Sequence, residues 1–223
     1  MRKRLLLYII IIIFVMLCSC NKEKQDKHIA DALESVVEIS VYESDETISV
    51  GTGVCVDDGE KILFAAHIFD YETINDYVIK CETIDGICYI LSVIKVDKEK
   101  DLALLQIDGG KLNPIVMSDT EAYWADDVFV IGNSCGLGLN VSKASVSCPL
   151  KRITINCAVF EMMQINITVN EGDSGGPVLN SDNELVGLIS FKLKDYTGTS
   201  VSDMSYSILL SDIKVFMNYT ANN

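Results

Sequence analysis

The 223-residue chain is 49% hydrophobic and 22% charged, which is enough apolar sequence for one packed domain and too much for global disorder. Its 18 basic and 32 acidic side chains give a formal charge of −14, which argues against the basic surface that binds nucleic acid. With two histidines and no Cys-x-x-Cys pair, a zinc site is not expected, and we expect no other cofactor.

The N-terminal segment is typical of a bacterial lipoprotein signal peptide. Residues 2–4 are basic, and an unbroken apolar run of thirteen residues extends from Leu5 to Leu17. At about 1.5 Å per residue, this run is too short to cross a hydrocarbon core of about 30 Å. It ends in Leu17-Cys18-Ser19-Cys20, which resembles a lipobox, whose last cysteine carries lipid. An uncleaved signal anchor is the alternative interpretation.

We therefore expect residues 1–19 to be removed and Cys20 to become the lipidated first residue. Residues 21–28 are polar and indicate a tether, and residues 29–223 would form the folded domain. Two or more acyl chains hold a protein stably at a membrane. The expected location is the periplasmic or extracellular face of a bacterial membrane.

The rest of the chain predicts short β-strands separated by turns. Helices are expected only at Ile29–Ser35 and at Asp212–Asn218, the second capped by Ser211. A dozen short strands at regular spacing favour an all-β barrel or sandwich. The expected strands are Val36–Tyr42, Ser49–Val56, Ile62–Ala66, Asp76–Thr83, Ile87–Val96, Leu102–Ile107, Val128–Gly132, Val141–Ser147, Ile153–Val159, Met162–Ile167, Pro177–Leu179 and Leu185–Phe191.

Six cysteines lie in the predicted domain, and an even number outside the cytoplasm raises the question of disulfides. Asp85-Gly86 predicts a two-residue hairpin loop that pairs residue 83 with residue 88. This register places Cys81 diagonally from Cys88 on one face, at a separation that is long for a disulfide. Buried free thiols are the alternative.

One serine lies among glycines, in Gly172-Asp173-Ser174-Gly175-Gly176-Pro177. Acyl transfer by a serine needs a base for its hydroxyl, an anion that orients the base, and N–H donors for the oxyanion. The glycines allow a tight turn on which the N–H groups of Gly172 and Ser174 point into one pocket. Ser174 is thus the candidate nucleophile, with Gly172 and Ser174 as the candidate oxyanion hole; an ordinary glycine-rich turn is the alternative.

His67 ends a predicted strand and is the one histidine of the predicted domain, since His28 lies in the tether. If an imidazole serves Ser174, it is His67. Asp101 precedes a wholly apolar strand and is the candidate for orienting the imidazole, although it could simply start that strand. The order His, Asp, Ser is that of the chymotrypsin fold.

These motifs resemble the trypsin-like serine proteases, and within them the HtrA branch of the bacterial cell envelope. The resemblance implies two six-stranded antiparallel β-barrels with the active site between them, a boundary near residues 108–125 and a short C-terminal helix. We expect no PDZ domain after that helix. The segments that carry the resemblance are Ser35-Val36-Val37-Glu38-Ile39, Gly51-Thr52-Gly53-Val54, Asp101-Leu102-Ala103-Leu104-Leu105, Ile131-Gly132-Asn133, Gly136-Leu137-Gly138, Ser174-Gly175-Gly176-Pro177 and Gly187-Leu188-Ile189.

The same resemblance implies a substrate site. The strand containing Ser190, Phe191 and Lys192 would pair with an extended peptide, and Thr168 would lie near the floor of the S1 pocket. Because a threonine has no charge to pair with a basic side chain, we expect small or medium neutral side chains before the scissile bond; an acidic side chain held by Lys192 or Lys194 is the alternative. Asp173 stands where the HtrA branch usually has asparagine. Because a buried carboxylate needs partners, we expect it to bind backbone N–H groups or a basic side chain such as Lys143 or Arg152.

The sequence thus predicts a serine endopeptidase of cell-envelope or extracellular proteins that works through an acyl-enzyme. Its partners would be protein or peptide substrates and, through the lipid anchor, a membrane. The alternative is a protease-like lipoprotein that binds peptides or acts as a chaperone with little or no catalysis.

Overall fold

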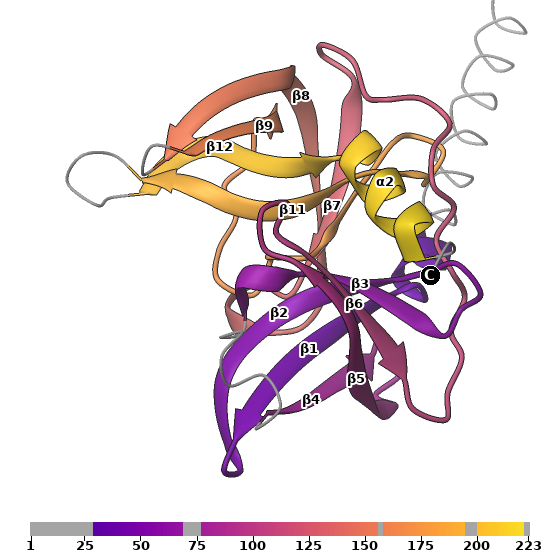
Figure 1. The fold of residues 1–223 in the computed structure, drawn as a ribbon. Coiled ribbons are helices and arrows are strands. Elements are labelled where there is room, and N and C mark those ends of the chain that lie inside the picture. The colour runs from indigo at the N-terminus through magenta and orange to yellow at the C-terminus, as the bar shows by residue number, and fades with distance from the viewer. Residues whose placement is uncertain (1–28, 69–76, 156–157, 195–199, 221–223) are drawn as a thin grey trace, which may run out of the picture.

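The computed structural model describes residues 29–68, 77–155, 158–194 and 200–220, so the predicted signal peptide and Cys20 lie outside the described residues. The described strands close into two six-stranded antiparallel barrels (Figure 1), which confirms the predicted all-β fold. In barrel order, the first contains β1 (Val36–Glu43), β2 (Glu46–Val56), β3 (Lys61–Ala65), β6 (Leu102–Ile107), β5 (Cys88–Asp97) and β4 (Val78–Thr83). The second contains β10 (Pro177–Leu179), β11 (Leu185–Lys194), β12 (Ser200–Leu209), β9 (Ala158–Ile165), β8 (Asn140–Ile155) and β7 (Asp127–Gly132).

The first barrel follows the predicted strands closely because its turns carry clear local signals. The β1–β2 hairpin turns at Ser44 and Asp45, whose φ angles of 49° and 70° give the primed turn that matches strand twist. The apolar run of β6 is buried along nearly its whole length, as expected for a strand inside a barrel wall. Between Ile107 and Asp127 the chain passes from the first barrel to the second.

The β4–β5 hairpin differs from the prediction by one residue. The N–H of Thr83 donates to the carbonyl of Ile87, and Gly86 adopts a positive φ of 78°, so the loop has three residues and not two. Cys88 therefore pairs with Glu82 instead of residue 83. A one-residue shift moves every side chain of the strand to the other face. Cys81 is buried, Cys88 is exposed, and both are free thiols, so the considered disulfide is wrong.

The second barrel contains one long strand where the sequence predicted separate ones. β8 runs from Asn140 to Ile155 and absorbs the predicted strand at 141–147 and the start of the one at 153–159. Shifts in its pairing with β9 between Val146 and Lys151 bend this strand without ending it. Strand β12 was not predicted, because serines occupy inward positions that usually hold apolar residues: Ser205 and Ser207 are fully buried.

The helix α2 (Leu210–Thr220) crosses the junction of the two barrels (Figure 1). Its buried Ile213 and Phe216 belong to one apolar cluster that includes residues of both barrels. The helix begins before Ser211, which is therefore not its N-cap; the N–H of Ser211 donates to Glu121 instead. Residues 29–33 are also helical. None of the helices in the described ranges is long and apolar enough to span a membrane.

Candidate active site

The fold brings the three predicted catalytic side chains together between the barrels. His67 lies in the one-turn 3₁₀ helix Ala66–Ile68 that follows β3, and Asp101 directly precedes β6. Because β3 and β6 are paired, with Ala65 opposite Leu102, these two residues leave adjacent strands at the same end. Ser174 lies on the turn before β10 in the second barrel.

Asp101 holds His67 through three contacts, two of them to the imidazole. Its carboxylate oxygens lie 2.8 and 3.0 Å from Nδ1, and Oδ1 also accepts the backbone N–H of His67 at 2.8 Å. The hydroxyl of Ser190 donates to Oδ2 as well. Asp101 has a φ of 57°, in the left-handed region that aspartate tolerates better than most residues. This arrangement fixes the ring so that Nε2 faces away from Asp101.

The hydroxyl of Ser174 lies within reach of that nitrogen. Its Oγ is 3.1 Å from Nε2 of His67 and 3.2 Å from the carbonyl oxygen of Ser190. The imidazole can therefore accept the hydroxyl proton, which is the geometry that nucleophilic catalysis requires.

The turn before Ser174 has the form expected of an oxyanion hole. Gly172 has a φ of 92°, and a Cβ there would collide with the carbonyl oxygen of Asn133, so only glycine fits. Within the described part of the chain, neither the N–H of Gly172 nor that of Ser174 donates a hydrogen bond. Two free donors on one turn can stabilise a developing oxyanion.

Thr52 of β2 fixes this turn and was not singled out by sequence reasoning. Its hydroxyl donates to the carbonyl of Gly172 at 2.6 Å and accepts the N–H of Asn133 at 2.8 Å. Its own N–H donates to the carbonyl of Ser174 at 2.9 Å. The flanking glycines in Gly51-Thr52-Gly53 were noted only as a family motif; a Cβ at either position would collide with side chains of the first barrel, Phe64 at Gly51 and Ile62 at Gly53.

Asp173 is 5% exposed and is held by neutral donors. Its carboxylate accepts the hydroxyl of Ser134 at 2.7 Å and the N–H of Asn170 at 2.7 Å. The backbone N–H that we expected is therefore present, whereas Lys143 pairs with Asp127 and Arg152 with Glu161. Ser134 was not predicted, and a serine in a loop gives no signal of its own.

The predicted substrate residues lie in different surroundings. Ser190 contacts both Ser174 and Asp101, whereas the ring of half-buried Phe191 packs against Tyr206 with centroids 5.4 Å apart. Lys192 belongs to β11, next to Phe191, and pairs with Ser205. Thr168 is exposed, and its hydroxyl accepts the N–H of Asp203 at 2.9 Å and lies 3.3 Å from the Asp203 carboxylate. Sequence reasoning missed this acidic neighbour.

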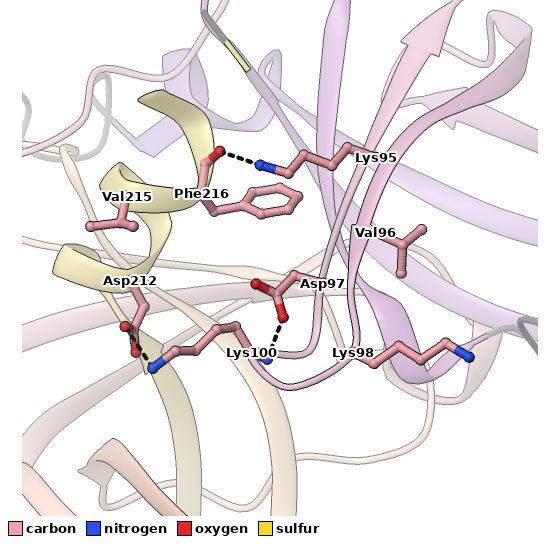
Figure 2. Close-up of a pocket in the computed structure, with 8 residues that line it drawn as sticks. All are labelled: Lys95, Val96, Asp97, Lys98, Lys100, Asp212, Val215 and Phe216. Carbon is pink, nitrogen blue, oxygen red and sulfur yellow. Dashed lines mark hydrogen bonds and ion pairs between the residues drawn. The ribbon is translucent and has the colours of Figure 1, made fainter. Parts of the chain in front are cut away.

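A cavity of about 390 Å³ lies between α2 and the turn that leads from β5 to Asp101 (Figure 2). Its cations are engaged: Lys95 donates to the carbonyl of Phe216, and Lys100 pairs with Asp212 at 2.9 Å. It contains none of the three predicted catalytic residues. Over the described ranges, no cluster of three or more histidine, cysteine or acidic side chains is placed to hold a metal.

Comparison with protein families matches residues 51–188, more than half of the chain, to the trypsin-like peptidase domain. The chain is 34% identical over 145 residues to the periplasmic serine endoprotease DegP of Escherichia coli (strain K12), covering 63% of this chain and 30% of the relative. It is 29% identical over 177 residues to serine protease HTRA1 of Xenopus laevis, covering 77% and 36%. The chain thus spans about a third of the length of these relatives.

Among solved structures, the serine endoprotease from Yersinia pestis superposes with a TM-score of 0.72 at 23% identity. The match covers 87% of this chain and 65% of that one. It supports the two-barrel fold independently of the strand pairing.

Proposed function

Because the chain belongs to the trypsin-like peptidase family, we propose that it is a serine endopeptidase of cell-envelope or extracellular proteins. The observation that carries this proposal is the continuous contact chain from Ser174 Oγ through His67 to Asp101. A catalytically silent, peptide-binding module would not need these three side chains at hydrogen-bonding distance.

In the proposed reaction, Ser174 Oγ bonds to the carbonyl carbon of the scissile peptide while its proton passes to Nε2 of His67. Asp101 stabilises the resulting imidazolium, and the N–H groups of Gly172 and Ser174 bind the oxyanion. The C–N bond then breaks as His67 gives its proton to the leaving amine. Water, deprotonated by His67, attacks the acyl-enzyme, and the second product leaves as its carboxylic acid while Ser174 regains its proton.

For the substrate, we propose that an extended peptide pairs with the strand at Ser190, Phe191 and Lys192. Thr168 would lie near the side chain that precedes the scissile bond. The Asp203 carboxylate beside Thr168 adds an acidic group to this region. The sequence predicted only neutral side chains at this place from Thr168, and the Asp203 carboxylate extends the proposal to basic ones.

The test of the catalytic proposal is a fluorophosphonate probe, which bonds only to an activated serine. Wild-type protein should be labelled and should hydrolyse an unfolded protein substrate, and Ser174→Ala should do neither. A wild-type protein that folds and remains unlabelled would favour the silent, peptide-binding alternative.

We further propose that Cys20 anchors the protein to a bacterial membrane, with residues 21–28 as its tether. The support is the lipobox-like end of the apolar N-terminal run. Cys20→Ser should release the domain from the membrane fraction or leave the precursor uncleaved. Unchanged fractionation and an unchanged mature mass would rule the anchor out.

A further inference from the structure

A cavity of about 400 Å³ lies beside Ser174 and has no role in the mechanism described so far. This size is within the roughly 300–1,000 Å³ of clefts that bind small ligands. The cavity is shared by the two barrels, and no residue of β11 lines it. Its lining residues are Thr47, Ile48, Ser49, Val50, His67, Ile68, Glu171, Gly172 and Ser174.

The direction of proton transfer indicates which part of a substrate would enter this cavity. His67 gives its proton to the leaving amine, so the residue that follows the scissile bond must lie against the imidazole. His67 lines the cavity, whereas Ser190, which contacts Ser174 and Asp101, does not. The cavity is therefore on the side of the leaving group.

One part of the cavity wall is aliphatic and is formed by Ile48, Val50 and Ile68. Ile48 is 45% exposed, which leaves apolar surface open to a ligand, and Val50 and Ile68 are half-buried. Gly51 lets the side chain of Ile68 pack against β2, because a Cβ at this position would lie 2.9 Å from the tip of Ile68. An aliphatic side chain seated here would remove apolar surface on both partners from water.

The acidic member of the lining is Glu171, which is exposed and directly precedes Gly172. Its carboxylate repels a negatively charged side chain in the same cavity. In a chain with a formal charge of −14, little long-range attraction offsets that repulsion.

The base of the cavity is fixed relative to the nucleophile. Thr52, which follows the lining strand segment, donates to the carbonyl oxygens of both Gly172 and Ser174. The aliphatic wall thus keeps its place beside the reacting bond, which is what side-chain selection requires.

We propose that this cavity binds the residue immediately after the scissile bond, that it selects aliphatic side chains there, and that it rejects acidic ones. This assignment rests on the proposed endopeptidase function. It names Ile48 and Glu171 as the residues that set the selection.

The assay uses peptides with one fixed sequence before the cut and Leu, Gly or Asp after it. For the wild type we expect kcat/KM about tenfold higher for Leu than for Gly, the scale of a small apolar contact, and lowest for Asp. Ile48→Ser should reduce the Leu-to-Gly ratio about threefold or more, and Glu171→Gln should raise the Asp-to-Gly ratio. Ile84→Ser is the matched control, since Ile84 is 46% exposed and lines neither cavity.

Fluorophosphonate labelling separates the two levels of the proposal, because the probe carries no residue after the scissile bond. An unlabelled wild type would overturn the endopeptidase function itself. A labelled wild type whose kcat/KM is indifferent to the residue after the cut, or a labelled Ile48→Ser with the wild-type ratios, would overturn the cavity assignment alone. Val50→Thr, which keeps the side-chain shape, provides the same test if Ile48→Ser fails to fold.

Discussion

The two barrels contribute to the active site in different ways. The first supplies His67 and Asp101 on paired strands and joins them by hydrogen bonds of its own. The second supplies Ser174 on a turn whose carbonyl groups are held by Thr52 of the first barrel. The acid–base pair is therefore joined within one barrel, with one added hydrogen bond from Ser190 of the second, whereas the position of the nucleophile depends on contacts across the interface.

Mutations of the acid–base pair and mutations of the interface should therefore have different effects. Removing the local pair should stop proton transfer without loosening the barrels. Removing a cross-barrel hydrogen bond should lower stability and activity together, because the same atoms hold the interface and the catalytic turn.

The largest effect is expected within the local pair. Asp101→Asn should lower kcat about 10⁴-fold, because an amide does not hold the imidazole in the tautomer that accepts the serine proton. The stability of Asp101→Asn to thermal unfolding should change little. Steady-state hydrolysis and thermal unfolding measure the two effects.

The matched control for this prediction is Asp97→Asn. Asp97 accepts the N–H groups of Glu99 and Lys100 in the same turn but makes no contact with His67. Asp97→Asn should change kcat by less than about threefold. Equal losses in both variants would mean that Asp101 acts by shaping the turn and not through the imidazole.

The next largest effect should come from the cross-barrel contact. Thr52→Val keeps the side-chain shape but leaves the carbonyl of Gly172 and the N–H of Asn133 without their buried partner. We expect a loss of about 1–3 kcal/mol in the free energy of unfolding and a parallel fall in kcat. Urea unfolding and peptide hydrolysis on the same sample check both.

Thr83→Val serves as the comparison within the first barrel. Thr83 is 8% exposed, and its hydroxyl accepts the N–H of Ile87 in the β4–β5 hairpin. This variant should lose stability with kcat unchanged. If Thr52→Val also kept its kcat, the dependence of the nucleophile on the interface would be disproved.

A smaller effect is expected at Asp173, inside the second barrel. Asp173→Asn keeps an oxygen acceptor for Ser134 or Asn170, so activity should stay above a tenth of the wild type. Ser134→Ala removes one donor from the carboxylate and should lower activity by a comparable factor. Hydrolysis rates of protein processed only at Cys20 give the measurement.

A larger loss of activity at Asp173 would point to activation by cleavage. The resemblance to trypsin-like proteases also implies an alternative, in which Asp173 pairs with an α-amino group that is freed by cleavage. Protein that stays inert until it is cut again near residues 29–36 would show that the neutral donors are insufficient. The catalytic turn would then need a cation to hold it.

The sequence predicted the candidate catalytic residues better than the residues that hold the catalytic turn in place. Ser174 stands in a glycine-rich motif and His67 is the one histidine of the predicted domain, so both have signals in the chain itself. Thr52 and Ser134 act through hydrogen bonds to residues 120 and 39 positions away. The residues next to a serine or threonine do not indicate a hydrogen-bond partner that lies so far along the chain.

The fold shows the same division. Apolar runs with turn residues predicted the first barrel almost strand by strand, yet the three-residue loop at Gly86 moved Cys81 and Cys88 to opposite faces. In β12, buried serines take the place of apolar residues, so the hydrophobic pattern did not predict this strand. Register and inward-facing polar positions depend on tertiary contacts, which composition does not report.

The smallest effect at neutral pH concerns the thiols, which differ from one another in burial. In the first barrel, burial raises the pKa values of Cys55 and Cys81 to about 12, whereas Cys135 in the second is exposed. An unfolded thiol ionises near pH ~8.5. The stability contributed by the two neutral buried thiols is therefore complete below that pH and is lost as the pH rises toward about 12. Urea midpoints of Cys55→Ala/Cys81→Ala should decline less steeply across this range than those of Cys88→Ala, whose thiol is exposed. Equal slopes, or native-state alkylation of Cys55 as fast as that of Cys88, would show that the first barrel opens to solvent more readily than its fully buried core indicates.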